Sequence, residues 1–195
     1  VSELVATRDG QTSLDPDDLV GLRLGHIATR GDLDAAEQRN VAKAITWGRR
    51  RRPTVEQILE ESFVRALHRR MFGDVWSWAG TYRTTSRNLG VDAWLIHEGV
   101  GALLGDTQHW IANDDDRDAL CVRVHHRLVH VHPFPNGNGR HARLFADLLA
   151  GGLGGEPFSW GATLPDAQSM RAAYIAALRA ADVGDPLPLI AFARS

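Results

Sequence analysis

The most regular feature of this sequence is a series of segments in which apolar residues recur every three or four positions. One such segment follows Thr54, a good helix N-cap, and its apolar positions are Val55, Ile58, Leu59, Phe63, Leu67 and Met71. Because this spacing places apolar side chains on one face, we predict helices that pack on a shared core. They cover about residues 34–47, 55–71, 95–111, 117–131, 138–149 and 166–181, and a short helix opens at Pro186.

Two stretches depart from helical spacing. Residues 81–91 are rich in β-branched and aromatic side chains and end in a turn signal, Asn88-Leu89-Gly90, which predicts a short β-hairpin. Residues 1–31 show weak periodicity, with one short helix expected near residues 16–20. We therefore expect a mainly α protein: an N-terminal arm over residues 1–31 and one helical domain with a hairpin flap over residues 32–195.

Composition narrows the class of protein. A chain of 195 residues can bury a proper core as one domain, or as one domain with an arm. A net charge of −2 gives no overall attraction to nucleic acid or to a membrane surface. The single cysteine, Cys121, excludes an intramolecular disulfide and is interpreted as a core residue. Without an apolar run of about 20 residues or a signal-peptide pattern at the N-terminus, we expect a cytoplasmic protein with no membrane contact.

Two clusters of charge have simple structural explanations. Residues 49–52 are four arginines before Pro53, and the acidic residues that follow can offset them. We interpret the run as a solvated helix end and expect no direct binding of nucleic acid. Residues 114–116 are three aspartates in a polar turn before a helix, where capping is a better explanation than a metal site.

Folding alone does not explain the residue types of one segment, HPFPNGNGRHAR, which runs from His132 to Arg143. Gly137 and Gly139 let the backbone bend and approach a ligand, and the N–H groups that open the next helix form an anion site. Arg140 and Arg143, spaced i and i+3, add two guanidinium groups that suit phosphate oxygens. His132 can take a proton near neutral pH. The segment indicates transfer of a nucleotide or phosphoryl group to a nucleophile.

The histidines before this segment raise the alternative of zinc. His126 and His130 have the i, i+4 spacing at which two imidazoles on a helix can share a metal. The segment lacks the glutamate of the H-E-x-x-H motif, and no acidic or cysteine ligand lies nearby in the sequence. Since the Gly-Asn-Gly-Arg continuation serves phosphate and not zinc, we favour the phosphate interpretation.

The segment resembles the signature of Fic domains, H-P-F-x-(D/E)-G-N-G-R-x-x-R, and matches every specified position except Asn136. Residues 72–83, FGDVWSWAGTYR, are similar to the segment before the target-docking flap of Fic domains. Together with Ser159-Trp160-Gly161 and the C-terminal residues 190–195, the pattern resembles the Fic branch labelled "mobile mystery protein B". The resemblance implies a mostly helical protein adenylyltransferase that moves AMP from ATP, with Mg²⁺, to a Ser, Thr or Tyr hydroxyl of a target protein.

The resemblance also implies roles for individual residues. His132 would be the base that deprotonates the target hydroxyl, and Phe134 would anchor the loop in the core. The nucleotide-binding residues would be Asn136, Gly137, Asn138, Gly139, Arg140 and Arg143, and the flap that docks the target would be Arg87, Asn88, Leu89 and Gly90.

Asn136 stands where the family has an Asp or Glu that holds Mg²⁺. An amide oxygen is a weaker, neutral ligand for this cation, so we expect weak metal binding that depends on the nucleotide phosphates. A nucleotide-binding module with little turnover, acting with a small regulatory or antitoxin-like partner, is therefore an alternative. Gly137 and Gly139 favour AMP transfer over the phosphate transfer of the Doc type, which remains a further alternative.

Glu37 is a candidate for inhibition. Many Fic proteins are held inactive by a glutamate that pairs with the second motif arginine, here Arg143. The surrounding residues, Leu33 and Gln38, do not match the family pattern (S/T)-x-x-x-E-(G/N). Asp34 and Glu37 have the spacing of a capping box, so we favour Glu37 as a residue of the first turn of its helix over an inhibitory role.

Overall fold

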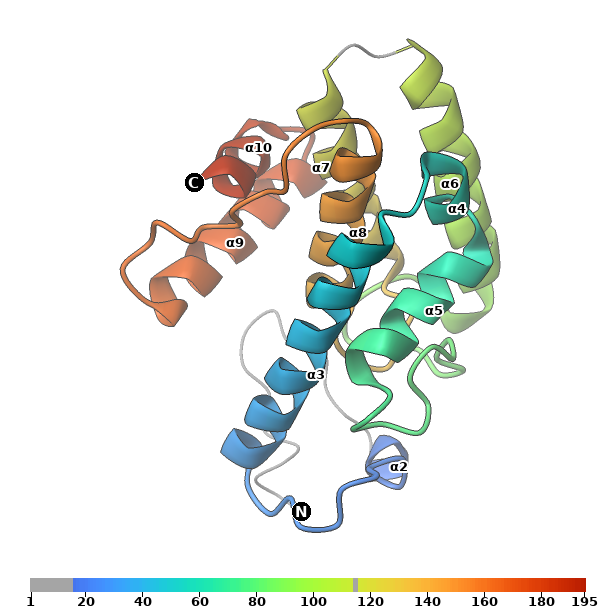
Figure 1. Cartoon of the computed structure of the whole chain (residues 1–195), viewed down its shortest axis with the longest axis vertical. Helices are drawn as coiled ribbons and strands as arrows, with labels where there is room; N and C mark the ends of the chain where they lie inside the picture. Colours follow the sequence, from blue (N-terminus) through green and yellow to red (C-terminus); the bar gives the residue numbers. More distant parts are fainter. Residues whose placement is uncertain (1–15, 114–115) are drawn as a thin grey trace.

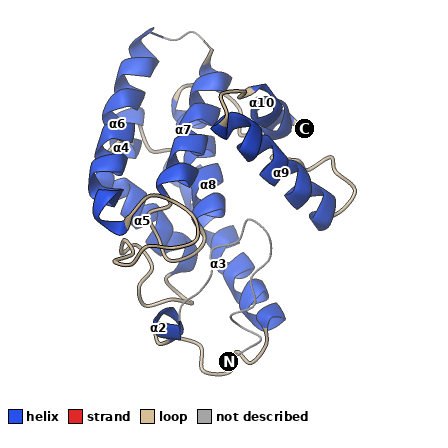
Figure 2. Cartoon of the chain, turned by 180° about the vertical axis from the view of Figure 1, so that it is seen from behind, coloured by secondary structure: helices blue, strands red, loops and turns tan. Residues whose placement is uncertain are grey.

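The described residues, 16–113 and 116–195 of a computed structural model, form an all-helical fold, and no strand occurs among them (Figures 1 and 2). In chain order the elements are α2 (Pro16–Leu19), α3 (Arg30–Arg51), α4 (Val55–Ile58), α5 (Glu61–Phe72), the 3-10 helix η1 (Ala93–Leu95), α6 (Ile96–Asn113), α7 (Arg117–Val131), α8 (Asn138–Gly152), α9 (Ala167–Asp182) and α10 (Leu187–Arg194). The predicted mainly α class is confirmed. Over this part of the chain, no helix is both long and apolar enough to cross a membrane.

Polar caps set several helix starts. Thr54 is the N-cap of α4, as expected, and it forms a reciprocal capping box with Gln57. Asp116 accepts a hydrogen bond from the Ala119 N–H at the start of α7. The run of arginines forms the last turn and the C-cap of α3, where positive charge is favourable to the helix dipole.

The start of α3 corrects the interpretation of Glu37. The helix begins at Arg30, where Thr29 and Asp32 form the capping box. Asp34 instead pairs with Arg30 one turn earlier, at 3.2 Å. Glu37 therefore lies well inside the helix and is 1% exposed, so its interpretation as a capping residue was wrong. The helix starts earlier than predicted because Thr29 caps it with its side chain, as Asp34 was expected to do. The first turn was missed because no apolar spacing marks it.

The core is organised around α8, which packs against α3, α4, α5 and α7. Helix α6 packs on the far side of α7, and α9 with α10 covers the remaining side of α7, so the molecule widens at that end (Figure 1). Large side chains at the centre are fully buried, among them Phe72, Trp76, Phe134 and Phe145. Cys121 is buried as predicted, and burial raises the pKa of its thiol to about 12.

The residues before α3 pack on the loop after α5. Leu22 and Trp76 form an isolated antiparallel bridge, and the Arg23 N–H donates to the Val75 carbonyl at 2.8 Å. The short helix expected near residues 16–20 is present as α2. Residues 81–91 form an irregular loop in which the expected hairpin pairing is not present.

Candidate active site

The loop of residues 132–137 joins the C-terminus of α7 to the N-terminus of α8. His132 is the C-cap of α7, has left-handed backbone angles (φ 54°, ψ 57°) and donates its N–H to the Leu128 carbonyl. Gly137 also has a positive φ, 80°, and a Cβ at this position would meet the Phe72 ring at 2.4 Å. Only glycine satisfies both conditions there, so the sharp turn into α8 depends on it.

Phe134 and Asn138 fix the shape of this loop. The Asn138 side chain accepts from the Phe134 N–H at 2.9 Å and donates to the Phe134 carbonyl at 2.7 Å. The Phe134 ring is fully buried, which confirms that it anchors the loop. Because both polar atoms of the Asn138 amide hold the loop, only the backbone N–H of Asn138 is suitably placed at the start of α8 to serve an anion.

His68 supports the same loop from α5. Its ring stacks on Phe134 with 3.7 Å between centroids, its Nδ1 accepts from the Gly80 N–H at 3.0 Å, and its Nε2 lies 3.0 Å from the Asn136 carbonyl. This arrangement requires a neutral ring that carries its proton on Nε2. Burial, with the neighbouring His141 as the next cause, lowers the pKa of His68 well below its usual value, so the support stays neutral.

His132 is itself held in one tautomer. Its ring is 5% exposed, and its Nδ1 lies 3.1 Å from the Val129 carbonyl, which requires a proton on Nδ1. Nε2 is then the basic nitrogen. Burial, and to a lesser degree the charge of Arg83, lower the pKa of His132 to about 4 although the Val129 carbonyl opposes them. The imidazole is therefore neutral and able to accept a proton at pH 7.

Arg83, to which the sequence analysis assigned no role, ties residues 81–91 to the end of α7. Its guanidinium donates to the His132 carbonyl at 2.7 Å and to the carbonyls of Thr85 and Val91, and its own N–H donates to the Pro133 carbonyl at 2.9 Å. Gly90 allows this loop to approach His132 closely, because a Cβ at position 90 would meet the His132 Cβ at 2.3 Å. The expected flap segment thus packs directly on the candidate base.

Glu37 reaches into the same site from α3. Its carboxylate lies 2.6 Å from Arg140 Nη2, 2.7 Å from the Trp76 indole nitrogen and 3.3 Å from the Asn136 amide nitrogen. The predicted inhibitory partner was Arg143, but the arginine that Glu37 engages is Arg140. Its carboxylate neutralises a guanidinium that would otherwise face phosphate, so the capping interpretation fails and a regulatory one gains physical support.

The side chain of Asn136 is committed within the protein. Its amide oxygen accepts from the Gly137 N–H at 2.7 Å, and its amide nitrogen donates to Glu37. The oxygen expected to contact Mg²⁺ therefore holds the turn, and in this conformation the residue does not fit a metal ligand. Among the described residues, no group of three or more His, Cys, Asp or Glu side chains is placed to hold a metal ion.

Arg143 has a different environment from Arg140. Its guanidinium lies over the Tyr174 ring, 5.2 Å from the centroid, and burial lowers the pKa of Arg143. The Tyr174 hydroxyl lies 3.0 Å from His125 Nε2, and it would lie 3.3 Å from a Cβ at Gly139. Tyr174 of α9 thus covers the side of the motif at Gly139, and the two motif arginines contact different neighbours.

The flap residues divide into two kinds. Arg87 points inward and pairs with both carboxylate oxygens of Asp18 in α2, at 2.9 and 2.8 Å. Asn88 is exposed and Leu89 is partly exposed, so these two residues face solvent beside His132. The sequence carried no signal for His68, Arg83 or Tyr174, because each acts through partners far away in the chain; Arg83 only ends the Fic-like segment of residues 72–83.

Comparison with known proteins agrees with this geometry. Residues 58–150 match the Fic/DOC family, a range that contains α5, α6, α7 and most of α8 and includes the loop of His132 as well as Arg140 and Arg143. Residues 58–150 therefore form a Fic/DOC family domain, and the described helices share the fold of a solved Fic-domain protein from Bacteroides thetaiotaomicron.

Curated relatives give a more specific indication. The chain is 34% identical over 145 residues to protein adenylyltransferase fic-1 of Caenorhabditis briggsae, an alignment of 71% of this chain and 26% of that protein. It is 31% identical over 144 residues to protein adenylyltransferase Fic of Drosophila grimshawi, covering 71% of this chain and 27% of that protein. The chain therefore spans about a quarter of the length of these relatives.

Solved structures share the fold at low identity. The BepC protein of Bartonella tribocorum with bound AMPPNP has a TM-score of 0.68 at 20% identity, covering 96% of this chain and 93% of that one. The N-terminal Fic domain of a Bartonella quintana protein with bound ADP also has a TM-score of 0.68, at 19% identity, covering 87% of this chain and 86% of that one.

Proposed function

We propose that this protein is an adenylyltransferase that moves AMP from ATP to a Ser, Thr or Tyr hydroxyl of a target protein. One observation carries the proposal: a single loop, ordered by Phe134 and Asn138, sets a neutral imidazole beside the N-terminus of α8. Names of relatives and the nucleotides bound by structural neighbours support it.

The proposed reaction uses the groups of this loop directly. His132 Nε2 takes the proton of the target hydroxyl, whose oxygen attacks the α-phosphorus of ATP. An O–P bond forms to the target, the bond between the α-phosphorus and the bridging oxygen breaks, and pyrophosphate leaves. The first N–H groups of α8 stabilise the α-phosphate, and Arg140 and Arg143 hold the β- and γ-phosphates. Magnesium would be carried by the phosphates themselves, since Asn136 contributes no charge.

The target is expected to approach along residues 87–90. This segment lies against His132 through Gly90, and its exposed residues Asn88 and Leu89 could align the main chain of a target next to the base. The same segment would then orient the hydroxyl and also limit which targets reach it.

Labelled ATP tests the reaction. With a cell lysate as the source of targets, ATP labelled at the α-phosphate should label a protein band, and ATP labelled at the γ-phosphate should not. His132→Ala should abolish labelling while ATP affinity changes less than about twofold, because the base acts on the nucleophile and not on the phosphates. Transfer from the γ-label would support the Doc-type phosphotransferase instead. Transfer above background in His132→Ala would refute the assigned base.

A second candidate is a nucleotide-binding module with little turnover that acts with a regulatory partner. The observation that favours it is that two polar groups of the site are already engaged within the protein. Glu37 pairs with Arg140, and the Asn136 amide oxygen accepts from the Gly137 N–H. Tight nucleotide binding without transfer at any Mg²⁺ or Mn²⁺ concentration, in both the wild type and Glu37→Gln, would favour the module.

A further inference from the structure

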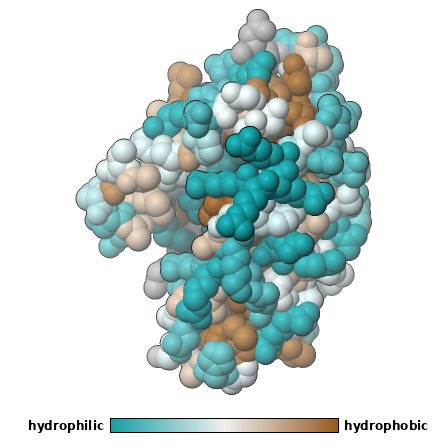
Figure 3. Space-filling view, viewed as in Figure 1, coloured by the Kyte–Doolittle hydropathy of each residue, from teal (hydrophilic) through white to brown (hydrophobic). Residues whose placement is uncertain are grey.

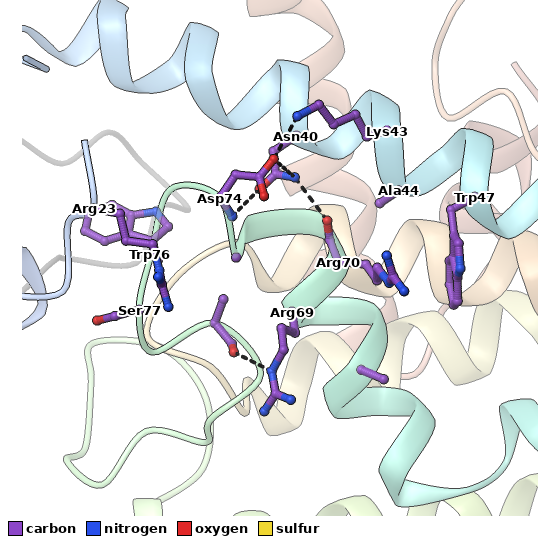
Figure 4. Close-up of a pocket in the computed structure, with 13 residues that line it drawn as sticks. Arg23, Asn40, Lys43, Ala44, Trp47, Arg69, Arg70, Asp74, Trp76 and Ser77 are labelled. Carbon is purple, nitrogen blue, oxygen red and sulfur yellow. Dashed lines mark hydrogen bonds and ion pairs between the residues drawn. The ribbon is translucent and has the colours of Figure 1, made fainter.

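A second concave site lies beside α5, and none of its lining residues belongs to residues 132–143. A cavity of about 600 Å³ opens between α3, α5 and the loop that follows α5 (Figure 4). Four cations from three parts of the chain line it: Arg23, Lys43, Arg69 and Arg70. Its volume lies in the range of roughly 300–1,000 Å³ that is typical of small-ligand sites.

The charges of the cavity do not balance. Asp74 is its single acidic residue, and Asp74 pairs with Lys43 at 2.8 Å. In the described part of the chain, no ion pair involves Arg23, Arg69 or Arg70, although all three line the same cavity. Three arginines that form no ion pair in the described part of the chain therefore line one hollow, in a protein whose net charge is −2.

The walls of the cavity are held in place by hydrogen bonds. Asn40 donates to the Arg70 carbonyl at 3.1 Å and accepts from the Asp74 N–H at 3.0 Å, which joins α3 to the end of α5. Arg69 Nε donates to the Ala79 carbonyl at 3.4 Å, and this orients its fork (Figure 4). Since these contacts exist without a ligand, binding would order few groups and would cost little entropy.

We propose that this cavity binds a ligand through a phosphate group. A dianionic phosphate offsets three guanidinium groups better than one carboxylate does, and planar guanidinium forks match pairs of phosphate oxygens. The volume leaves room for the body of a phosphorylated small molecule or of a phosphorylated side chain. The site is separate from the motif cradle, and the proposal does not depend on AMP transfer.

The aromatic residues of the cavity argue against single-stranded nucleic acid. Base binding needs an open aromatic face. Trp47 is already stacked with Phe63, at 6.3 Å between centroids, and the guanidinium groups of Arg70 and Arg51 lie 5.2 and 5.6 Å from its ring. Hydrophilic residues do gather over α3 beyond the cavity (Figure 3), so general attraction of polyanions needs a control.

The cavity also adjoins the candidate active site. Trp76 lines the cavity, and its indole nitrogen donates to Glu37, which engages Arg140. A ligand that shifts Trp76 would act on the partner of a motif arginine. A ligand bound in the cavity is therefore placed to affect Arg140 through Trp76 and Glu37.

Isothermal titration with inorganic pyrophosphate tests the proposal. The Arg140→Gln variant, which removes one of the two arginines of the motif cradle, should still bind the probe. Adding Arg69→Gln and Arg70→Gln should weaken that binding about tenfold or more, because two charge-assisted contacts are removed. The matched control is Arg50→Gln with Arg51→Gln, which removes the same charge from α3 outside the cavity and should change affinity less than about twofold.

Two further measurements keep the outcome clear. If the Arg69 and Arg70 variants fail to fold, Arg23→Gln replaces them, since Arg23 is exposed. This variant should reduce the rise in Tm caused by pyrophosphate. A phosphoserine peptide and a sugar phosphate, titrated separately, distinguish the two sources of the phosphate. Equal weakening by the Arg50 and Arg51 control, preference for an oligonucleotide, or no binding in Arg140→Gln would overturn the proposal.

Discussion

At the residue scale, the site is decided by which polar groups are already engaged. Asn138 holds the loop, Asn136 holds the turn at Gly137, and Glu37 holds Arg140. A buried carboxylate is costly unless it is paired, and Arg140 provides this pairing for Glu37. A bound phosphate would have to compete with Glu37 for the same guanidinium group. These polar groups of the site thus already have partners within the protein. A bound nucleotide would have to replace one of these contacts.

Glu37→Gln tests this competition. The change keeps the size of the side chain and an acceptor for the Trp76 indole, but it removes the charge that holds Arg140. Nucleotide affinity or the transfer rate should rise by about tenfold, which corresponds to one modest shift in the population of free Arg140. Calorimetry and α-labelled ATP measure the two quantities.

The control for Glu37→Gln is Asp34→Asn, which removes one acidic residue of the same helix at a half-exposed ion pair. It should leave affinity and rate unchanged, because exposed pairs contribute little. Unaltered nucleotide affinity and rate in Glu37→Gln would show that Arg140 binds phosphate equally well with its partner in place.

Asn136→Asp tests the departure from the family signature. The new carboxylate would supply the hard oxygen ligand that Mg²⁺ prefers, so the Mg²⁺ concentration at half-maximal rate should fall. It would also face Glu37, whose carboxylate lies 3.3 Å from the Asn136 nitrogen, and like charges oppose each other at that distance. The double variant with Glu37→Gln should therefore show the larger decrease. An identical Mg²⁺ dependence in all three proteins would mean that residue 136 never faces the cation.

At the element scale, residues 81–91 and the end of α7 behave as one unit. Arg83 is 3% exposed and donates hydrogen bonds to the His132 carbonyl at the end of α7 and to the Thr85 carbonyl in the loop. The His132 carbonyl would otherwise be an unpaired acceptor at the buried end of α7, which is costly. The irregular loop is therefore not a free flap at its base, and His132 keeps its left-handed backbone because Arg83 holds its carbonyl.

Arg83→Lys tests this coupling. Lysine keeps the charge but cannot serve several carbonyls with a planar fork. A small displacement of His132 should lower kcat by about a hundredfold, while KM for ATP stays within about threefold, because the α8 cradle is untouched.

Arg65→Lys is the matched control for Arg83→Lys, since Arg65 contacts the Gly80 carbonyl near the same loop but not α7. It should keep kcat within about threefold of the wild type. An equal loss of kcat in both variants, or a rise in KM for ATP alone, would show that Arg83 only stabilises the loop.

At the scale of the whole molecule, buried neutral histidines link the fold to pH. Burial lowers the pKa of His132 and of His141 to about 4, and it lowers the pKa of His68 and His125 well below the usual value. Between these values and 6.5, the unfolded chain binds more protons than the native protein, so the free energy of unfolding decreases as pH falls. Burial raises the pKa of Asp18 to about 6 and also raises the pKa of Asp147, and these two carboxyl groups oppose the trend.

Denaturant unfolding between pH 7 and pH 5 measures this effect. Each buried histidine should remove about 1.4 kcal/mol of unfolding free energy per pH unit below its unfolded pKa. His141→Gln should reduce the slope of unfolding free energy against pH by one proton, because glutamine does not titrate. The variant should still fold, since its amide can donate to the Val64 carbonyl that His141 Nε2 contacts. His109→Gln, at an exposed position of α6, should not change it. A stability that is constant from pH 7 to pH 5 would contradict the neutral histidines.

The sequence by itself determined what depends on neighbouring residues. Helical spacing and caps such as Thr54 and Asp116 placed most helices, because a helix forms its hydrogen bonds within a few residues. Residues 132–143 indicated their chemistry because base, turn and cradle are adjacent in the chain.

Only the tertiary structure decided which distant groups meet. Glu37 and Arg140 are 103 positions apart, and Arg83 and His132 are 49 apart, so no local pattern could pair them. The packing of α3 and α5 likewise assembled the basic cavity from charged residues that no sequence pattern singled out. Periodicity reports which face of a helix is buried, but the partner of a buried charge depends on how whole helices pack.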